Sequence, residues 1–103
     1  MNVFSDCFGN KVRLNDERLA HILDHPEMRG METEIEQVLA RPRIVRRSRS
    51  DAAIRLFYEF YAQTLVNDKW LCVVVKYMVN DAFVVTAYLT DKPKNGEDLW
   101  PIK

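Results

Sequence analysis

The spacing of apolar residues changes at Pro42, and this change constrains the fold more than any other feature of the sequence. Before Pro42, apolar residues such as Met31, Ile35 and Leu39 recur with the period of about 3.6 residues that is typical of a helix. After Pro42, apolar and polar residues alternate with the two-residue period of a strand. Helices followed by strands, rather than a regular alternation of the two, indicate an α+β fold.

Two helices are predicted before Pro42. The segment "NDERLAHILDH" begins with Asn15, a favourable N-cap residue, and Pro26 disfavours helical geometry at His25, so the first helix is expected to end there. The second helix is expected to end at Pro42. Ahead of both, "NVFSDCFGNKVRL" predicts a short hairpin with residues 9 and 10 at its turn.

Four strand segments follow, namely "RIVRRS", "IRLFYEFY", "WLCVVVKY" and "AFVVTAYLT". Their connections, "SRSD", "VND" and "VND", are short and polar, which favours an antiparallel meander. The last segment, "DKPKNGEDLWPIK", is turn-like, and Trp100 is expected to hold it against the body. The predicted fold is α+β, with an N-terminal hairpin, two helices and a four-stranded antiparallel meander sheet in a single domain over residues 1–103.

The composition limits the classes of function. A hydrophobic fraction of 48% is enough for a core, and a net charge of zero argues against a tail that binds polyanions indiscriminately. The two cysteines lack metal-ligand spacing, the N-terminus lacks the pattern of a signal peptide, and no apolar run is long enough to span a bilayer. We therefore expect a cytoplasmic protein that has no membrane segment and uses no metal or other cofactor.

The net charge of zero conceals an uneven distribution. Residues 15–40 contain seven carboxylates against two arginines, and residues 41–55 contain six arginines against one aspartate. A guanidinium group is a planar fork that suits phosphate as well as carboxylate. Two interpretations stay open: the arginines pair with acids of the protein itself, as Arg41 and Arg43 would with the acidic helices, or they contact phosphate groups of a ligand.

His21 and His25 are four residues apart and share one face of the predicted first helix, rotated away from its apolar stripe. A metal site is disfavoured because zinc needs at least three protein ligands and the sequence offers no third one nearby. Two alternatives remain. Either His25 caps the end of the helix and His21 makes a half-buried polar contact, or the imidazoles act as general acid and base.

Strict alternation in "AFVVTAYLT" places Thr86 and Tyr88 on one face and the odd-numbered residues on the other. The hydroxyl face is either an ordinary solvated face or the floor of a site. The register decides whether Lys76 joins it. Pairing of Val75 with Thr86 puts Lys76 on the opposite face, whereas pairing of Val74 with Thr86 puts Lys76 beside the hydroxyls. Together, imidazole, cations and hydroxyls suit metal-free RNA cleavage, which needs a base for the 2′-OH, a cation and an acid.

The chain as a whole resembles a known family. The segments that carry this likeness are "RLNDERLAHILDHPEM", "VLARPRIVRRS", "LFYEF", "KWLCVVVKY" and "FVVTAYLT", over roughly residues 10 to 100. They resemble a bacterial and phage-associated family that is grouped with the barnase–EndoU–colicin–RelE-like nucleases. The resemblance implies two helices followed by an antiparallel sheet. It also implies a metal-independent endoribonuclease that cleaves RNA by 2′-OH attack, and a toxin-like enzyme of this kind would be held by an antitoxin or immunity-type protein.

Carried over by position, the resemblance implies a set of catalytic residues: His21, His25, Lys76, Thr86 and Tyr88. The candidate substrate-binding residues are Arg46, Arg47, Arg55 and Tyr58. In a nuclease, His21 or His25 should approach Thr86 and Tyr88 around one concave surface, together with at least one of Arg46, Arg55 and Lys76. Residues scattered over two faces cannot act on the same phosphodiester.

Glu59 departs from the family pattern, since relatives usually carry Arg after the paired aromatics of the second strand. A carboxylate there would repel a phosphodiester if it faced the site. The alternative function is therefore a catalytically degenerate relative of the same fold that binds RNA or protein. A further alternative is a structural or regulatory partner with no nucleic-acid role.

Overall fold

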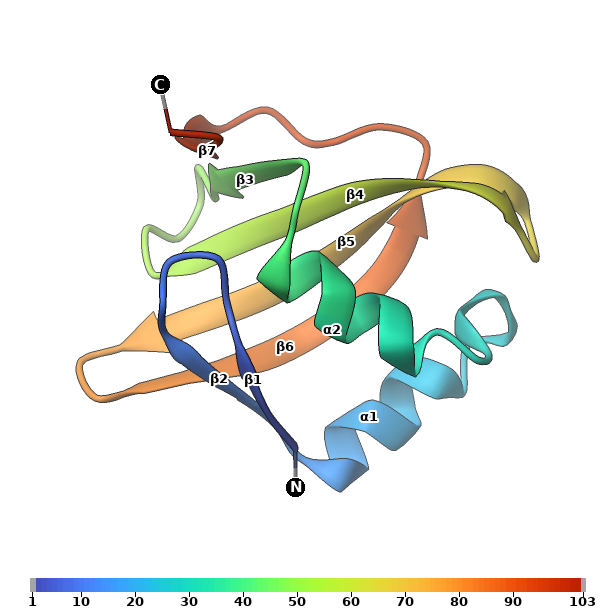
Figure 1. Cartoon of the computed structure of the whole chain (residues 1–103), viewed down its shortest axis with the longest axis horizontal. Helices are drawn as coiled ribbons and strands as arrows, with labels where there is room; N and C mark the ends of the chain where they lie inside the picture. The colour runs from blue at the N-terminus through green and yellow to red at the C-terminus, as the bar shows by residue number, and fades with distance from the viewer. Residues whose placement is uncertain (1, 103) are drawn as a thin grey trace.

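The structure, a computed structural model, describes residues 2–102. Along the chain run β1 (Asn2–Ser5), β2 (Lys11–Leu14), α1 (Asp16–Leu23), the 3₁₀ turn η1 (Pro26–Met28), α2 (Glu32–Ala40), β3 (Ile44–Arg47), β4 (Ile54–Thr64), β5 (Asn67–Met78), β6 (Asp81–Thr90) and β7 (Glu97–Trp100) (Figure 1). The α+β order of hairpin, helices and strands is confirmed. None of the helices described is long and apolar enough to cross a bilayer.

The seven strands form one sheet in the order β1-β2-β6-β5-β4-β3-β7. Strands β3 to β6 pair antiparallel, as the meander predicts. The sheet is larger than the predicted four strands for two reasons. The hairpin joins it through a parallel bridge between Arg13 and Phe83, and β7 pairs antiparallel with β3. The C-terminal segment is thus a strand where a turn was predicted, because it satisfies main-chain groups on the otherwise open edge of β3.

The helix boundaries follow local chemistry. Asn15 is the N-cap of α1, and its side chain accepts a hydrogen bond of 2.7 Å from the backbone N–H of Arg18. The helix ends at Leu23, two residues earlier than predicted, and Asp24 is its C-cap. His25 has extended backbone angles and begins the next 3₁₀ turn, as expected of a residue before proline. His25 therefore does not cap α1.

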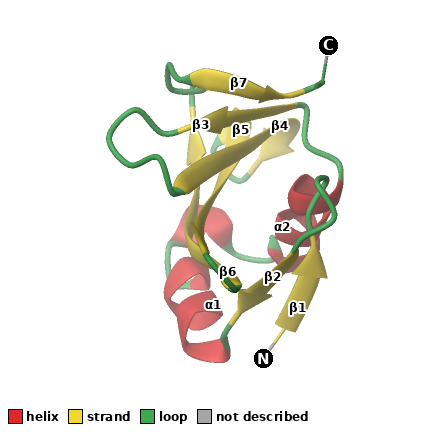
Figure 2. Ribbon diagram, turned by 90° about the vertical axis from the view of Figure 1, so that its left-hand side faces the viewer, coloured by secondary structure: helices red, strands yellow, loops and turns green. Residues whose placement is uncertain are grey.

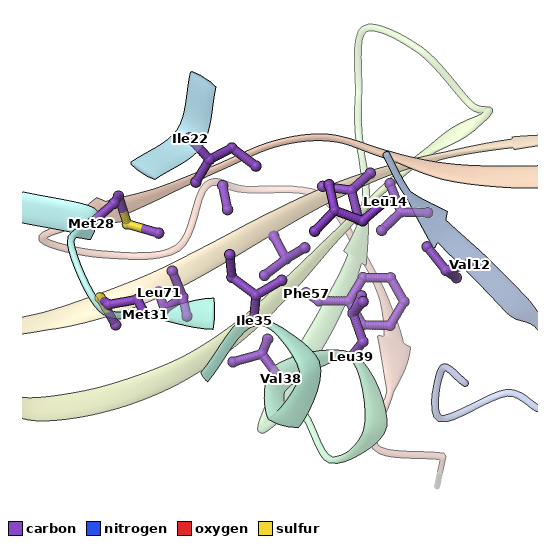
Figure 3. Packing of buried hydrophobic residues seen from close by; sticks show 14 of the residues in the cluster. Val12, Leu14, Ile22, Met28, Met31, Ile35, Val38, Leu39, Phe57 and Leu71 are labelled. Atoms are coloured by element: carbon purple, nitrogen blue, oxygen red, sulfur yellow. The ribbon is translucent and has the colours of Figure 1, made fainter. Parts of the chain in front are cut away.

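The two helices fill one face of the sheet, which we call the inner face. α2 contacts β1, β4 and β5, while α1 contacts β6, and the sheet curls around α2 (Figure 2). Ile22 of α1, Ile35 and Leu39 of α2, and Phe57 and Leu71 of the sheet belong to one buried hydrophobic cluster (Figure 3). Because this packing covers the centre of the inner face, an open site in the middle of the sheet must lie on the opposite, outer face.

Asp6 fastens the N-terminal hairpin to the sheet. Asp6 is 5% exposed, and among residues 2–102 it is the one charged residue that is buried. Its carboxylate accepts hydrogen bonds from the backbone N–H groups of Phe8 and Asn10 at 2.9 and 2.8 Å, and from the hydroxyl of Tyr77 in β5 at 2.5 Å. These bonds shape the hairpin turn and repay the cost of burying a charge.

We predict that Tyr77→Phe lowers the free energy of unfolding by about 1.5–3 kcal/mol, the usual contribution of a hydrogen bond to a charged group. Urea denaturation followed by circular dichroism measures this difference. Tyr61→Phe is the matched control, because the Tyr61 hydroxyl makes no hydrogen bond to the other described residues. Equal stabilities of the two variants would contradict the role given to Asp6.

Candidate functional site

A β-bulge in β6 determines which side chains reach the outer face. Val75 pairs with Val84, whereas Val74 pairs with Thr86, so Val85 has no partner. The extra residue shifts the alternation by one. The predicted alternation is therefore correct from Thr86 onward and wrong before the bulge, where Val84 is a core residue of the inner face.

The register places Lys76 on the outer face. The pairing of Val74 with Thr86 is one of the two predicted registers, and Lys76 lies two residues from Val74 and therefore on the same face. The extra residue is in the strand rather than in the turn. The ammonium group of Lys76 lies 3.5 Å from a carboxylate oxygen of Asp51, so an acid of the protein itself already partners this cation.

An open hollow of about 390 Å³ lies on the outer face. We call it the outer hollow. Its floor is apolar, and its sides carry polar and charged groups from three segments. The floor consists of Ile54, Leu56 and Val74, and the sides consist of Ser48, Arg49, Ser50, Thr86, Tyr88, Lys94 and Asn95. The site thus combines a flat apolar surface with hydroxyl groups and two cations.

The segment of residues 91–96, which we call the strap, leads from the end of β6 to β7 at the far edge of the sheet (Figure 1). Its contacts with Tyr58 and Arg46 place it on the outer face. The backbone N–H of Lys94 donates to the Tyr58 hydroxyl at 3.0 Å, and Arg46 donates to the Lys94 carbonyl at 2.9 Å. The Lys94 ammonium lies 6.0 Å from the centre of the Tyr88 ring. A side chain at Gly96 would approach the Arg47 carbonyl oxygen within 2.5 Å. The strap is therefore held close to the sheet.

Two tyrosines and a cysteine lie beneath the strap. Burial raises the pKa of Tyr58 to about 12 and that of Cys72 to about 11. Burial, followed by the neighbouring Cys72, also raises the pKa of Tyr88. These groups stay protonated near neutral pH and do not act as bases. Tyr58 was predicted to bind substrate, but its side chain is fully buried because it supports the strap.

The histidines lie apart from the outer hollow, of whose lining neither is a part. His21 is exposed on α1, in a shallow depression that it shares with Asn15 and Arg18. His25 is also exposed, and its Nδ1 atom lies 4.0 Å from a carboxylate oxygen of Glu27. The expected single site that joins a histidine to Thr86 and Tyr88 is therefore not formed. The apolar stripe of α1 packs toward the inner core and turns the imidazole of His21 to the solvent.

The arginines predicted to bind substrate are divided between the two faces. Arg46 lies on the outer face and Arg47 on the inner face, and both pair with carboxylates of β7, at 2.8 and 3.1 Å. The guanidinium of Arg55 lies on the inner side, 4.9 Å from the ring of Phe8 and 4.3 Å from that of Tyr77. Internal pairing thus applies to Arg46 and Arg47, but their partners are the acids of β7 rather than those of the helices.

Glu59 lies outside the outer hollow. It pairs with Leu71 on the inner face, and its carboxylate is 3.1 Å from the guanidinium of Arg43. Together with Glu36 it lines a larger groove of about 550 Å³ between α2 and β4. Two carboxylates make this groove unfavourable for a phosphate group.

Of the ten residues that line the outer hollow, the sequence predicted only Thr86 and Tyr88 as site residues. Arg49 was part of the arginine-rich segment, but nothing in the pattern distinguished it from its neighbours. Lys94 and Asn95 belong to a segment predicted as a turn, and their position depends on the path of the strap over the sheet. The nearest sequence indication was Gly96, since a glycine allows two backbone segments to approach closely.

Within residues 2–102, no three His, Cys, Asp or Glu side chains lie close enough together to hold a metal ion. Comparison with protein-family models, with curated proteins and with solved structures finds no match to this chain. The function is therefore inferred from the outer hollow and the side chains that line it.

We predict that the four tyrosines of the folded protein do not ionise near pH 10. Burial is the leading cause that raises the pKa of Tyr58 and Tyr61 from 10.0 to about 12, and it raises the pKa of Tyr77 and Tyr88 as well. Because each pKa is higher in the folded state, the stability that these groups contribute is present below pH 10 and is lost as the pH rises through the folded-state pKa.

Absorbance of tyrosinate and circular dichroism, recorded together in an alkaline titration, measure this. The phenolate signal is expected to rise only as the protein unfolds, whereas the chain unfolded in denaturant should titrate near pH 10. Phenolate at pH 10 with an unchanged circular dichroism spectrum would contradict the burial of these hydroxyls.

Proposed function

We propose that this protein binds single-stranded RNA in the outer hollow and does not cleave it. The observation that carries the proposal is the lining of the hollow. An apolar floor and the ring of Tyr88 lie beside Arg49 and Lys94, with no carboxylate among the lining residues. Single-stranded nucleic acids are bound by this combination, in which bases contact flat apolar or aromatic groups and phosphates contact cations.

The lining favours binding over cleavage. Cleavage by 2′-OH attack requires a proton acceptor within hydrogen-bond reach of that hydroxyl. The residues that line the outer hollow include no imidazole and no carboxylate, and the raised pKa of Tyr88 keeps its phenol protonated. Of the two histidines predicted to be catalytic, His21 lines a different depression and His25 lies beside Glu27. The geometry thus supports the catalytically degenerate alternative better than the endoribonuclease.

The hydroxyl groups of the hollow favour RNA over an apolar peptide. Ser48, Ser50 and Thr86 line its sides, and the two serine hydroxyls are 3.1 Å apart. A hydroxyl both donates and accepts hydrogen bonds, and so it suits the 2′-OH and the edges of unstacked bases.

We predict that fluorescently labelled single-stranded RNA binds with a weak dependence on salt. Contacts from Arg49 and Lys94 to two phosphates give a slope of log K against log salt of about −1.4. Arg49→Ala or Lys94→Ala should weaken binding and reduce the slope to about −0.7. Fluorescence anisotropy at several salt concentrations measures both quantities. Arg18→Ala and His21→Ala, on α1, are the controls and should leave the affinity unchanged.

Two outcomes would contradict the proposal. If the RNA is cut in the presence of EDTA by the wild-type protein but not by His21→Ala, the protein is an endoribonuclease that acts through α1. If Arg18→Ala weakens binding and Lys94→Ala does not, RNA binds to the helical side.

A further inference from the structure

A pair of aromatic side chains lies on the outer face beyond the strap. Phe60 of β4 and Trp70 of β5 are direct cross-strand neighbours, with ring centres 5.6 Å apart. Phe60 is 39% exposed, and Trp70 is half-buried in a T-shaped contact with the ring of Tyr58. This contact with Tyr58 accounts for the buried part of Trp70, but it leaves the exposed ring surface of the pair without a role in the core.

The surroundings of this pair suit an anion. The guanidinium of Arg43 lies 5.9 Å from the centre of the Trp70 ring. It pairs with the Glu59 carboxylate at 3.1 Å, and its side chain, which is 60% exposed, leaves it open to a further anionic partner. On β4 and β5, no outward-facing residue from the Phe60–Trp70 pair to the Ile54–Lys76 pair carries a carboxylate. Exposed aromatic rings next to a cation, on two strands whose outward-facing residues in this stretch carry no carboxylate, complement a nucleic-acid strand rather than an apolar peptide.

Lys94 stands between this pair and the outer hollow. On β5, Trp70 and Val74 are four residues apart, which corresponds to about 13 Å along the strand. The backbone of Lys94 is bonded to Tyr58, which lies between Phe60 and Leu56 in β4 on the same face. The strap therefore divides the outer face into the outer hollow on one side and the aromatic pair on the other.

We propose that Phe60 and Trp70 form a second base-binding position for the RNA that occupies the outer hollow. One base lies on the floor of the hollow, the phosphate crosses the strap beside the ammonium of Lys94, and the next base stacks on the aromatic pair. This inference rests on the proposed function and specifies the ligand further. The smallest RNA that uses both positions is a dinucleotide, and a mononucleotide uses only one.

Tryptophan fluorescence tests the inference directly, because the sequence contains two tryptophans and Trp100 packs against Phe8 away from this face. In a Trp100→Phe variant, Trp70 is the single fluorophore. Titration with uridylyl-uridine and with a longer oligouridylate should quench its fluorescence, whereas uridine monophosphate should quench it weakly. In a Trp70→Phe variant, the signal of Trp100 should not change.

Affinity provides the second measurement. Removing one stacked base contact by Phe60→Ala or Trp70→Leu should weaken oligouridylate binding about 5- to 150-fold. Phe83→Ala is the matched control. Phe83 is also a half-buried ring of the sheet, with the guanidinium of Arg13 5.1 Å from its centre. It lies near the start of β6, whereas Trp70 pairs with the end of that strand. Thermal unfolding of each variant establishes that it is folded at the temperature of the binding measurement. If Trp70→Leu is not folded at that temperature, the affinity of Phe60→Ala alone decides the test.

The outcomes separate the two proposals. If labelled RNA binds and Lys94→Ala weakens it, while Trp70 fluorescence and the Phe60→Ala affinity stay unchanged, the second base position is wrong and the outer hollow is right. If RNA quenches Trp70 but Arg49→Ala and Lys94→Ala have no effect, the aromatic pair binds RNA independently and the shared dinucleotide site is wrong. If no RNA binds at all, both proposals fail.

Discussion

The bulge at Val85 is the constraint on which the site depends. If the pairing of Val75 with Val84 continued without it, Val74 would face Val85, and Thr86 would pair with Val73 and point into the inner core. The inner face around Val73 and Ala87 belongs to a buried apolar cluster, so a threonine hydroxyl there would be buried among apolar side chains at a cost in free energy. The extra residue in β6 thus lets Val84 face the inner core before the bulge and lets Thr86 and Tyr88 face outward after it. The outer hollow requires these outward-facing hydroxyls.

The strap depends on the same sheet. Its hydrogen bond to Tyr58 requires that the tyrosine side chain point outward from the sheet. The packing of Tyr58 in a buried cluster with Cys72 on the outer face fixes this orientation. In return, the strap covers these residues and supplies Lys94 to the surface. Its contact with Arg46 and the close approach of Gly96 to β3 lead the chain to the sheet edge as β7. A binding surface is thereby built from segments far apart in sequence.

The sequence predicts the elements well and the site incompletely. The period of the apolar residues reveals both helices and strands β3 to β6, since it reflects which face each element buries. It does not reveal the bulge, because Val84 and Val85 are equally suited to a core, nor β7, whose pairing depends on an open edge rather than on its own residues. The predicted site residues prove to lie in separate places for a related reason. The spacing predicts which face of the helix carries His21, but it does not predict where that face lies relative to Thr86.

The most direct test of the outer face as the RNA-binding surface is an NMR titration of the isotopically labelled protein with a short oligouridylate. If the RNA binds on the outer face, the backbone signals of residues 48–50, 86–88 and 94–95 shift together as the RNA is added, while those of α1 around His21 stay in place. Shifts concentrated on α1, or in the groove between α2 and β4, with an unchanged outer hollow would contradict it.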